Sequence, residues 1–110
     1  MPRDTRKISF ACSFFQSSVE LTQERADHIA TQHPDFFPKY AMRIPETLLE
    51  PDLVRQDPNR PDCKQFIKFY AHLNTIVAVI VTTERNFIGT AYNTSKVPQG
   101  GILWQKKPSD

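Results

Sequence analysis

Apolar and polar residues alternate in several stretches of the chain, and this pattern predicts strands. The first stretch, Ile8 to Phe15, has the period of a half-buried strand and is expected at an edge of a sheet. Lys64 to Leu73 and Phe87 to Thr94 alternate in the same way, and Thr75 to Thr83 between them is almost continuously apolar and β-branched. Such a run is typical of a central strand covered on both faces. A last short strand is expected at Ile102 to Lys106.

Two segments have helical signals. Thr22 is a suitable N-cap, and apolar residues then recur at helical spacing until Pro34, which predicts a helix from Thr22 to His33. Ile44 to Glu50, with Pro45 in the first turn and Pro51 after the end, is expected to form a second helix. This order predicts an α+β fold, with amino-terminal helices packed on a four- to five-stranded, mainly antiparallel sheet.

Length and composition restrict the class of protein. The 110 residues fit a single domain, 1–110, and 39% hydrophobic with 24% charged residues favours a packed core. The net charge of +2 is too small to indicate a nucleic-acid binder by itself. The longest apolar run, Ile76 to Val81, is too short to cross a membrane and no signal-peptide core opens the chain, so a cytoplasmic protein is expected. Cys12 and Cys63 are expected to be reduced thiols.

The histidines are the first candidates for chemistry. RNA can be cleaved without metal when one group removes the 2'-hydroxyl proton and another protonates the leaving oxygen, and histidine suits both tasks. His28 and His33 are five residues apart, so on an ideal helix their side chains point about 140° away from each other. A helix that ends before His33 instead lets that side chain turn back towards His28. His33 could equally cap the helix end, and His28 could be an ordinary boundary residue.

Polar side chains on the predicted strands are further candidates. Thr90, Tyr92 and Thr94 form a row of three hydroxyls on one side of their strand. Lys68 and Tyr70 share one side of the strand that begins near Lys64. Threonine and tyrosine are also favoured on the solvent face of any strand, so the row alone does not define a site.

Three segments, in order, resemble a known family. They are His28 to Asp35 (HIATQHPD), Ile44 to Asp52 (IPETLLEPD), and Thr90 to Lys96 (TAYNTSK) with Trp104 beyond. Together they resemble the phage-associated barnase, EndoU, colicin and RelE-like nuclease domains, which have the BECR fold. Those domains similarly show a histidine-rich helix ending in His-Pro-acid, a segment like Ile-x-Glu-Thr-Leu-x-x-Pro-Asp and a late strand like Thr-Ala-Tyr-x-Thr. The resemblance runs from His28 to Trp104.

The resemblance implies a helical amino-terminal part on a four-stranded antiparallel sheet, with a ribonuclease site between them. By this analogy His28 or His33 supplies the acid or base. The other roles implied are phosphate binding by Thr90, Tyr92 and Thr94, charge and a hydrogen bond from Lys68 and Tyr70, and a position at the mouth of the site for Lys96. RNA is the implied substrate, an antitoxin or immunity protein is a further candidate partner, and no cofactor is implied.

The expected function is therefore a metal-independent endoribonuclease that leaves a 2',3'-cyclic phosphate, acting as a toxin, a phage-conflict effector or an RNA-processing enzyme. One alternative is a catalytically silent module of the same fold that binds RNA or a protein. Another is an assembly protein that pairs through the strand at Ile8 to Phe15. A metal enzyme has least support, because acidic residues are scattered and the histidines lack the spacing of a ligand triad.

Overall fold

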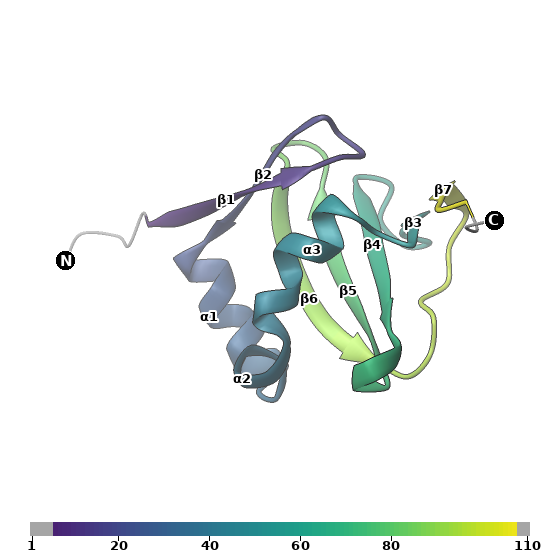
Figure 1. The fold of residues 1–110 in the computed structure, drawn as a ribbon. Coiled ribbons are helices and arrows are strands. Elements are labelled where there is room, and N and C mark those ends of the chain that lie inside the picture. Colours follow the sequence, from purple (N-terminus) through teal and green to yellow (C-terminus); the bar gives the residue numbers. More distant parts are fainter. Residues whose placement is uncertain (1–5, 108–110) are drawn as a thin grey trace.

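A single curled sheet of seven strands dominates the fold (Figure 1). The structure is a computed structural model that describes residues 6–107, except for the side chains of Phe37 and Pro38. The strands follow the order β1-β2-β6-β5-β4-β3-β7 across the sheet. They are β1 (Lys7–Cys12), β2 (Ser17–Thr22), β3 (Leu53–Gln56), β4 (Cys63–Tyr70), β5 (Thr75–Thr82), β6 (Phe87–Thr94) and β7 (Ile102–Gln105). Three short helices, α1 (Gln23–Gln32), α2 (Phe36–Tyr40) and α3 (Ile44–Leu49), lie between β2 and β3.

The predicted fold class, amino-terminal helices on a four- to five-stranded sheet, is wrong. The fold is mostly β, the sheet has seven strands, and two of them precede the first helix. The sheet is also mixed, because β2 runs parallel to β6. The missed strand β2 follows a tight turn in which Gln16 adopts a φ of 54°, a conformation that a glycine would have signalled in the sequence. The missed strand β3 has only four residues, too few for its alternation to stand out.

The centre of the sheet is the antiparallel meander β4-β5-β6. Residues of β5 pair with β4 from Thr75↔Tyr70 to Thr82↔Cys63, and with β6 from Ile76↔Thr94 to Thr82↔Phe87. The six residues from Ile76 to Val81 are all buried, which agrees with the central strand predicted from this apolar run. The three strands therefore form a rigid platform with two different faces.

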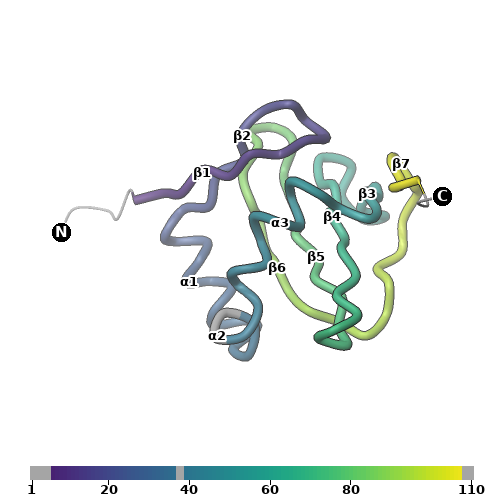
Figure 2. The backbone as a smooth tube through the Cα atoms, viewed as in Figure 1, coloured from purple at the N-terminus to yellow at the C-terminus, as the bar shows by residue number. Residues whose placement is uncertain are grey.

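One face of this platform is covered by the helices, as the backbone in Figure 2 also shows. Thr22 caps α1 by accepting a hydrogen bond from the Arg25 backbone N–H at 3.1 Å, as its sequence position predicted. Helix α3 begins with Pro45 in its first turn and ends before Glu50. The main core lies between helices and sheet and includes Ile29, Phe36, Ile44, Leu48, Phe66, Tyr70, Val77, Val79 and Ile88.

The opposite face of the platform carries the other alternating set. Cys63, Gln65, Ile67 and Phe69 of β4 lie in register with Thr82, Ile80, Ala78 and Ile76 of β5. Ile80, Ala78 and Ile76 are in turn paired with Thr90, Tyr92 and Thr94 of β6. The segment 95–101 connects β6 to β7 along this side, where its backbone accepts hydrogen bonds from Arg55 and Gln65. We call this surface the open face, since the helices pack on the other one.

None of the helices in the described part of the chain is long and apolar enough to cross a membrane.

Candidate functional site

Helix α1 lies beside β6 and contributes to both faces of the sheet. Its residue Ile29 is fully buried in the main core. Arg25, His28 and Gln32 are spaced by three and four residues, so they lie together on one side of the helix, next to the side that carries Ile29. These three side chains reach the border of the open face.

A pocket of about 280 Å³ lies between that side of α1 and the open face. Both candidate histidines of the sequence, His28 and His33, line it together with Thr90. Arginines come from two elements, Arg25 on α1 and Arg60 on the loop between β3 and β4. The remaining lining residues are Gln32, Cys63, Ile80, Thr82 and Gly89. Among the described residues that line the pocket, none carries a carboxylate.

His33 joins this pocket because α1 ends just before it. Its backbone leaves the helical region at φ −132° and ψ 72°, while its N–H still donates to the Ile29 carbonyl at 2.7 Å. The imidazole stacks on the Tyr92 ring, with 5.5 Å between centroids and 29° between planes. The 140° separation expected on an unbroken helix therefore does not apply. The helix end turns His33 onto the same pocket as the exposed His28.

Arg25 is fixed to the sheet at an irregularity in β6. The register of β5 and β6 shifts between Ile80 and Val81, which leaves Gly89 as the extra residue of a bulge. The Arg25 Nε donates to the Gly89 carbonyl at 3.1 Å, and Nη2 donates to the same oxygen. The guanidinium thus satisfies the bulge carbonyl and is held at the pocket.

The loop of residues 57–62 brings Arg60 to the pocket. The Asp57 carboxylate accepts hydrogen bonds from the backbone N–H groups of Asn59 and Arg60, at 2.8 and 3.1 Å, which closes a tight turn. The Gln56 side-chain amide donates to the carbonyls of Arg60 and Cys63. The predicted surface turn therefore has a fixed geometry, and its arginine lines the same pocket as the two histidines.

Two ionisable groups near the pocket have raised pKa values. Burial raises the pKa of the Cys63 thiol, and the carboxylates of Asp62 and Asp57 add to this effect. Burial is also the main cause that raises the pKa of the Tyr92 phenol, with a smaller contribution from Asp57. Both groups are therefore held in their neutral forms at neutral pH, which suits packing and hydrogen bonding better than nucleophilic attack.

The hydroxyl row of β6 extends away from the pocket. Thr90 lines the pocket, Tyr92 stacks on His33, and Thr94 lies further along the same face. The Thr94 Oγ1 accepts a hydrogen bond from the Lys96 backbone N–H at 3.1 Å, so Thr94 and Lys96 belong to the far end of β6. Lys96 is exposed there.

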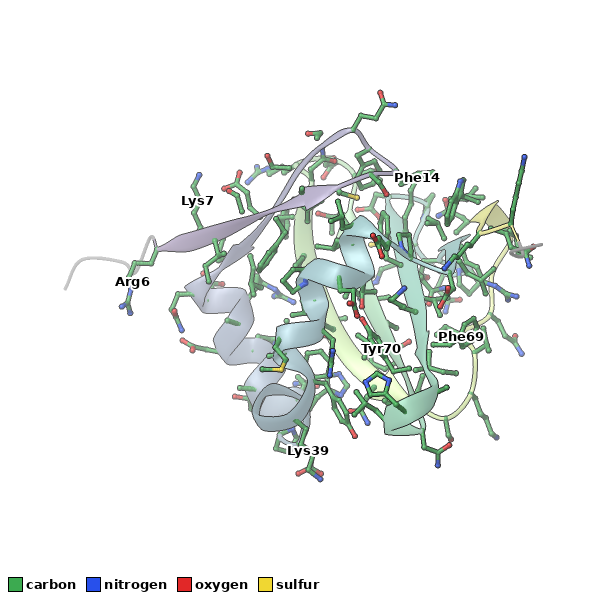
Figure 3. The ribbon with its side chains drawn as sticks, viewed as in Figure 1. Arg6, Lys7, Phe14, Lys39, Phe69 and Tyr70 are labelled. Atoms are coloured by element: carbon green, nitrogen blue, oxygen red, sulfur yellow. The ribbon has the colours of Figure 1, made fainter. Side chains whose placement is uncertain are left out.

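Lys68 and Tyr70 lie on the helix side of the sheet and do not line this pocket. Figure 3 labels Tyr70 and the neighbouring Phe69. The Lys68 ammonium donates to the Glu50 carbonyl at 2.7 Å. Tyr70 is only 3% exposed and its hydroxyl lies 3.1 Å from that of Thr47 on α3. The alternation that groups these two residues is correct, but the face they share is the packed one. We therefore leave both out of the proposed site.

Sequence reasoning missed Arg25, Gln32 and Arg60. The spacing of Arg25, His28 and Gln32 was a readable signal, since it places all three on one side of the predicted helix. No local signal indicates Arg60, because its position depends on how a loop between two distant elements folds back. Within residues 6–107, no group of three or more histidine, cysteine, aspartate or glutamate side chains converges in a way that could hold a metal ion.

No protein-family model, curated protein or solved structure matches this chain. The resemblance to the phage-associated nuclease domains thus stays a prediction from the three sequence segments. The proposed function therefore depends on the geometry of the pocket.

Proposed function

We propose that this protein is a metal-independent endoribonuclease whose active site is the pocket between α1 and the open face. The observation that carries the proposal is that two imidazoles, His28 and His33, share one pocket with two guanidinium groups, and that no carboxylate lines it among residues 6–107. This combination offers proton transfer and anion binding at the same place.

The proposed reaction uses the two histidines as a pair. One neutral imidazole takes the proton of a ribose 2'-hydroxyl, and the freed oxygen attacks the adjacent phosphorus. The bond from phosphorus to the 5'-oxygen of the next nucleotide breaks, and the second, protonated imidazole donates a proton to that oxygen. The products are a 2',3'-cyclic phosphate and a 5'-hydroxyl, and the two histidines have exchanged protonation states. Such a pair gives a bell-shaped dependence of kcat/KM on pH.

The two guanidinium groups are proposed to bind the scissile phosphate. Arg25, fixed by its bonds to Gly89, and Arg60, on the loop of residues 57–62, both line the pocket. The charge that grows on the phosphorane oxygens is stabilised by donors that are already in place. The Thr90 hydroxyl and the Gln32 amide supply further neutral donors.

The test measures cleavage of total cellular RNA and transfer RNA by purified protein in the presence of EDTA. His28→Ala and His33→Ala are each expected to lower the rate by about 100-fold or more, and the double variant to abolish it. His72→Ala is the matched control, because His72 is an exposed histidine on the 3-10 turn Ala71–Leu73, remote from the pocket. The product ends are checked for the cyclic phosphate.

Full cleavage by the double histidine variant would overturn the proposal. RNA binding without cleavage by the wild type would instead support the second candidate, a binding module that uses the same pocket. The stacking of His33 on Tyr92 is the observation that favours this second candidate, because a packed imidazole can serve structure alone.

A further inference from the structure

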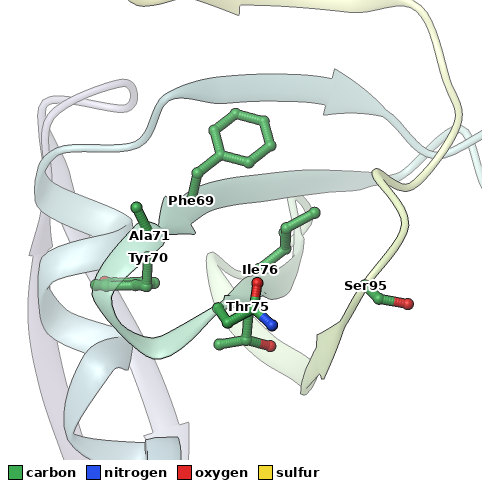
Figure 4. A pocket seen from close by; sticks show the side chains of 7 residues that line it. Phe69, Tyr70, Ala71, Thr75, Ile76 and Ser95 are labelled. Carbon is green, nitrogen blue, oxygen red and sulfur yellow. The ribbon is translucent and has the colours of Figure 1, made fainter.

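Phe69 is a large aromatic side chain that the fold leaves in solvent. It lies on β4 with 44% of its surface exposed, although its neighbours Ile67 and Tyr70 are buried. It lines a second pocket, also about 280 Å³, with Ile76 and Ser95 (Figure 4). Its backbone N–H donates to the Asp52 carboxylate at 2.8 Å, which fixes the strand at this point. The backbone is thus held at this point, and the ring is left partly exposed at the pocket.

This second pocket and the histidine pocket lie on the same open face. On β4, Cys63 lines the histidine pocket and Phe69 lines the second one, and their even spacing puts both on one face. On β5, Ile80 lines the histidine pocket and Ile76 lines the second pocket. The rungs of the sheet at Ile80 and Ile76 are four residues apart, which is about 13 Å along the strand. An extended nucleic-acid strand covers this distance with roughly two nucleotides.

We propose that Phe69 is a stacking platform for a nucleobase of single-stranded RNA whose scissile phosphate lies in the histidine pocket. This inference rests on the proposed function and names its substrate class, an unpaired RNA segment rather than a duplex. The stacked base belongs to a nucleotide roughly two positions from the cleavage site. Lys96, next to Ser95 at the same end of β6, is placed to meet a backbone phosphate of that segment.

The surface between the two pockets favours RNA over an apolar protein segment. Gln65 and Ile67 of β4 and Ala78 of β5 are buried between the pockets, so the accessible path follows β6. Thr90 and Tyr92 present hydroxyls along this path, while the Thr94 hydroxyl donates to the Lys96 carbonyl at 3.2 Å. Ribose and phosphate oxygens accept hydrogen bonds from such groups, whereas an apolar side chain would leave them unpaired. A base also needs only one ring face to stack on, and an exposed phenylalanine supplies it.

The experiment compares two substrate lengths. Cleavage is measured for an unstructured hexanucleotide of uridines and adenines and for dinucleotides of the same bases, which are too short to reach Phe69. Phe69→Ala is expected to lower kcat/KM for the hexanucleotide by about tenfold, through KM, and to leave the dinucleotides unaffected. Phe69→Trp should restore the rate on the hexanucleotide, and Phe69→Leu should not. Leu103→Ala, which removes an exposed apolar side chain on β7, is the control.

Equal losses on both lengths, an unchanged hexanucleotide rate, or full activity in Phe69→Leu would each overturn the stacking role. The proposed nuclease activity would survive any of these results, since it depends on the histidine variants. If the wild type cleaves neither length, binding of a fluorescent hexanucleotide is measured by anisotropy. Binding that weakens about tenfold in Phe69→Ala would support the stacking role while the nuclease proposal fails, and binding indifferent to Phe69 would overturn the stacking role as well.

Discussion

Adjacent residues of β4 point to opposite faces of the sheet and differ in exposure, which decides which of them a ligand can reach. Phe69 is 44% exposed on the open face, and Tyr70 is 3% exposed on the helix side. The hydroxyl of Tyr70 does not require solvent, because it makes a hydrogen bond inside the fold with the Thr47 hydroxyl. Thr47 in turn lies 2.7 Å from the Arg43 carbonyl and donates to it. Tyr70 serves packing, and its effect is expected in stability rather than in catalysis.

The buried phenol of Tyr70 makes stability depend on pH in alkaline solution. Burial is the main cause that raises its pKa to about 12, with Thr47 working in the opposite direction. Because the folded protein holds the neutral phenol more firmly than the unfolded chain does, the stabilisation is complete below pH 10 and is lost between about pH 10 and 12. A shift of about two pKa units corresponds to a loss of about 3 kcal/mol in the free energy of unfolding.

The measurement is urea denaturation at several pH values from 8 to 12, for the wild type and for Tyr70→Phe. The variant keeps the ring but cannot ionise, so its free energy of unfolding should fall less steeply with pH. It starts about 1 kcal/mol lower at pH 8 because the hydrogen bond with Thr47 is lost. Parallel curves for both proteins would show that Tyr70 ionises freely, which contradicts its burial.

At the scale of elements, the segment 95–101 positions the last strand, and one glycine makes this approach possible. Gly100 has a φ of 145°, and a Cβ built there would lie 2.0 Å from the Gln56 carbonyl oxygen. We expect Gly100→Ala to lower the free energy of unfolding by about 2 kcal/mol or more, since the backbone of β3 must move to admit the methyl group. Gly101→Ala is the matched control, because a Cβ at Gly101 meets nothing within 4 Å.

Trp104 reports on this region, since it is the single tryptophan and lies on β7 opposite Val54. In Gly100→Ala its fluorescence should change at a lower urea concentration than far-UV circular dichroism does, because β7 detaches before the central strands unfold. Coincident transitions with an unchanged midpoint would mean that the segment 95–101 accommodates the extra carbon. Loss of all structure would mean that β7 is required for folding.

Sequence patterns predicted those elements whose signals are local. The bounds of α1 follow from Thr22 and Pro34, and those of β5 from its β-branched run. Strand β2 could not be predicted in the same way, because its turn uses Gln16 in a left-handed conformation instead of a glycine. The histidines of the site were found because α1 carries both, whereas Arg60 depends on contacts between distant segments. Which face of β4 the helices cover likewise depends on tertiary packing, so alternation alone cannot exclude Lys68 and Tyr70 from the site.

At the scale of the molecule, the hairpin at one edge of the sheet and the central strand differ in how firmly they are paired. The hairpin of β1 and β2 joins the platform by a single bridge, Glu20 with Phe87, although its residues Cys12, Val19 and Leu21 enter the main core. Strand β5, in contrast, is paired along its whole length on both sides. Local opening of the hairpin therefore breaks few backbone hydrogen bonds, whereas opening of β5 requires the platform to unfold.

Hydrogen exchange tests this difference and the assembly hypothesis together. Amides of β5 are expected to exchange slowest, at the rate set by global unfolding, and those of β1 that point away from β2 to exchange without protection at micromolar concentration. Slow exchange of these outer amides that becomes slower as the protein concentration rises would show that β1 pairs with a second chain. Protection independent of concentration would contradict the loose attachment of the hairpin. Fast exchange of these amides at every concentration would contradict the assembly hypothesis. The pocket beside α1 would then remain the candidate functional surface.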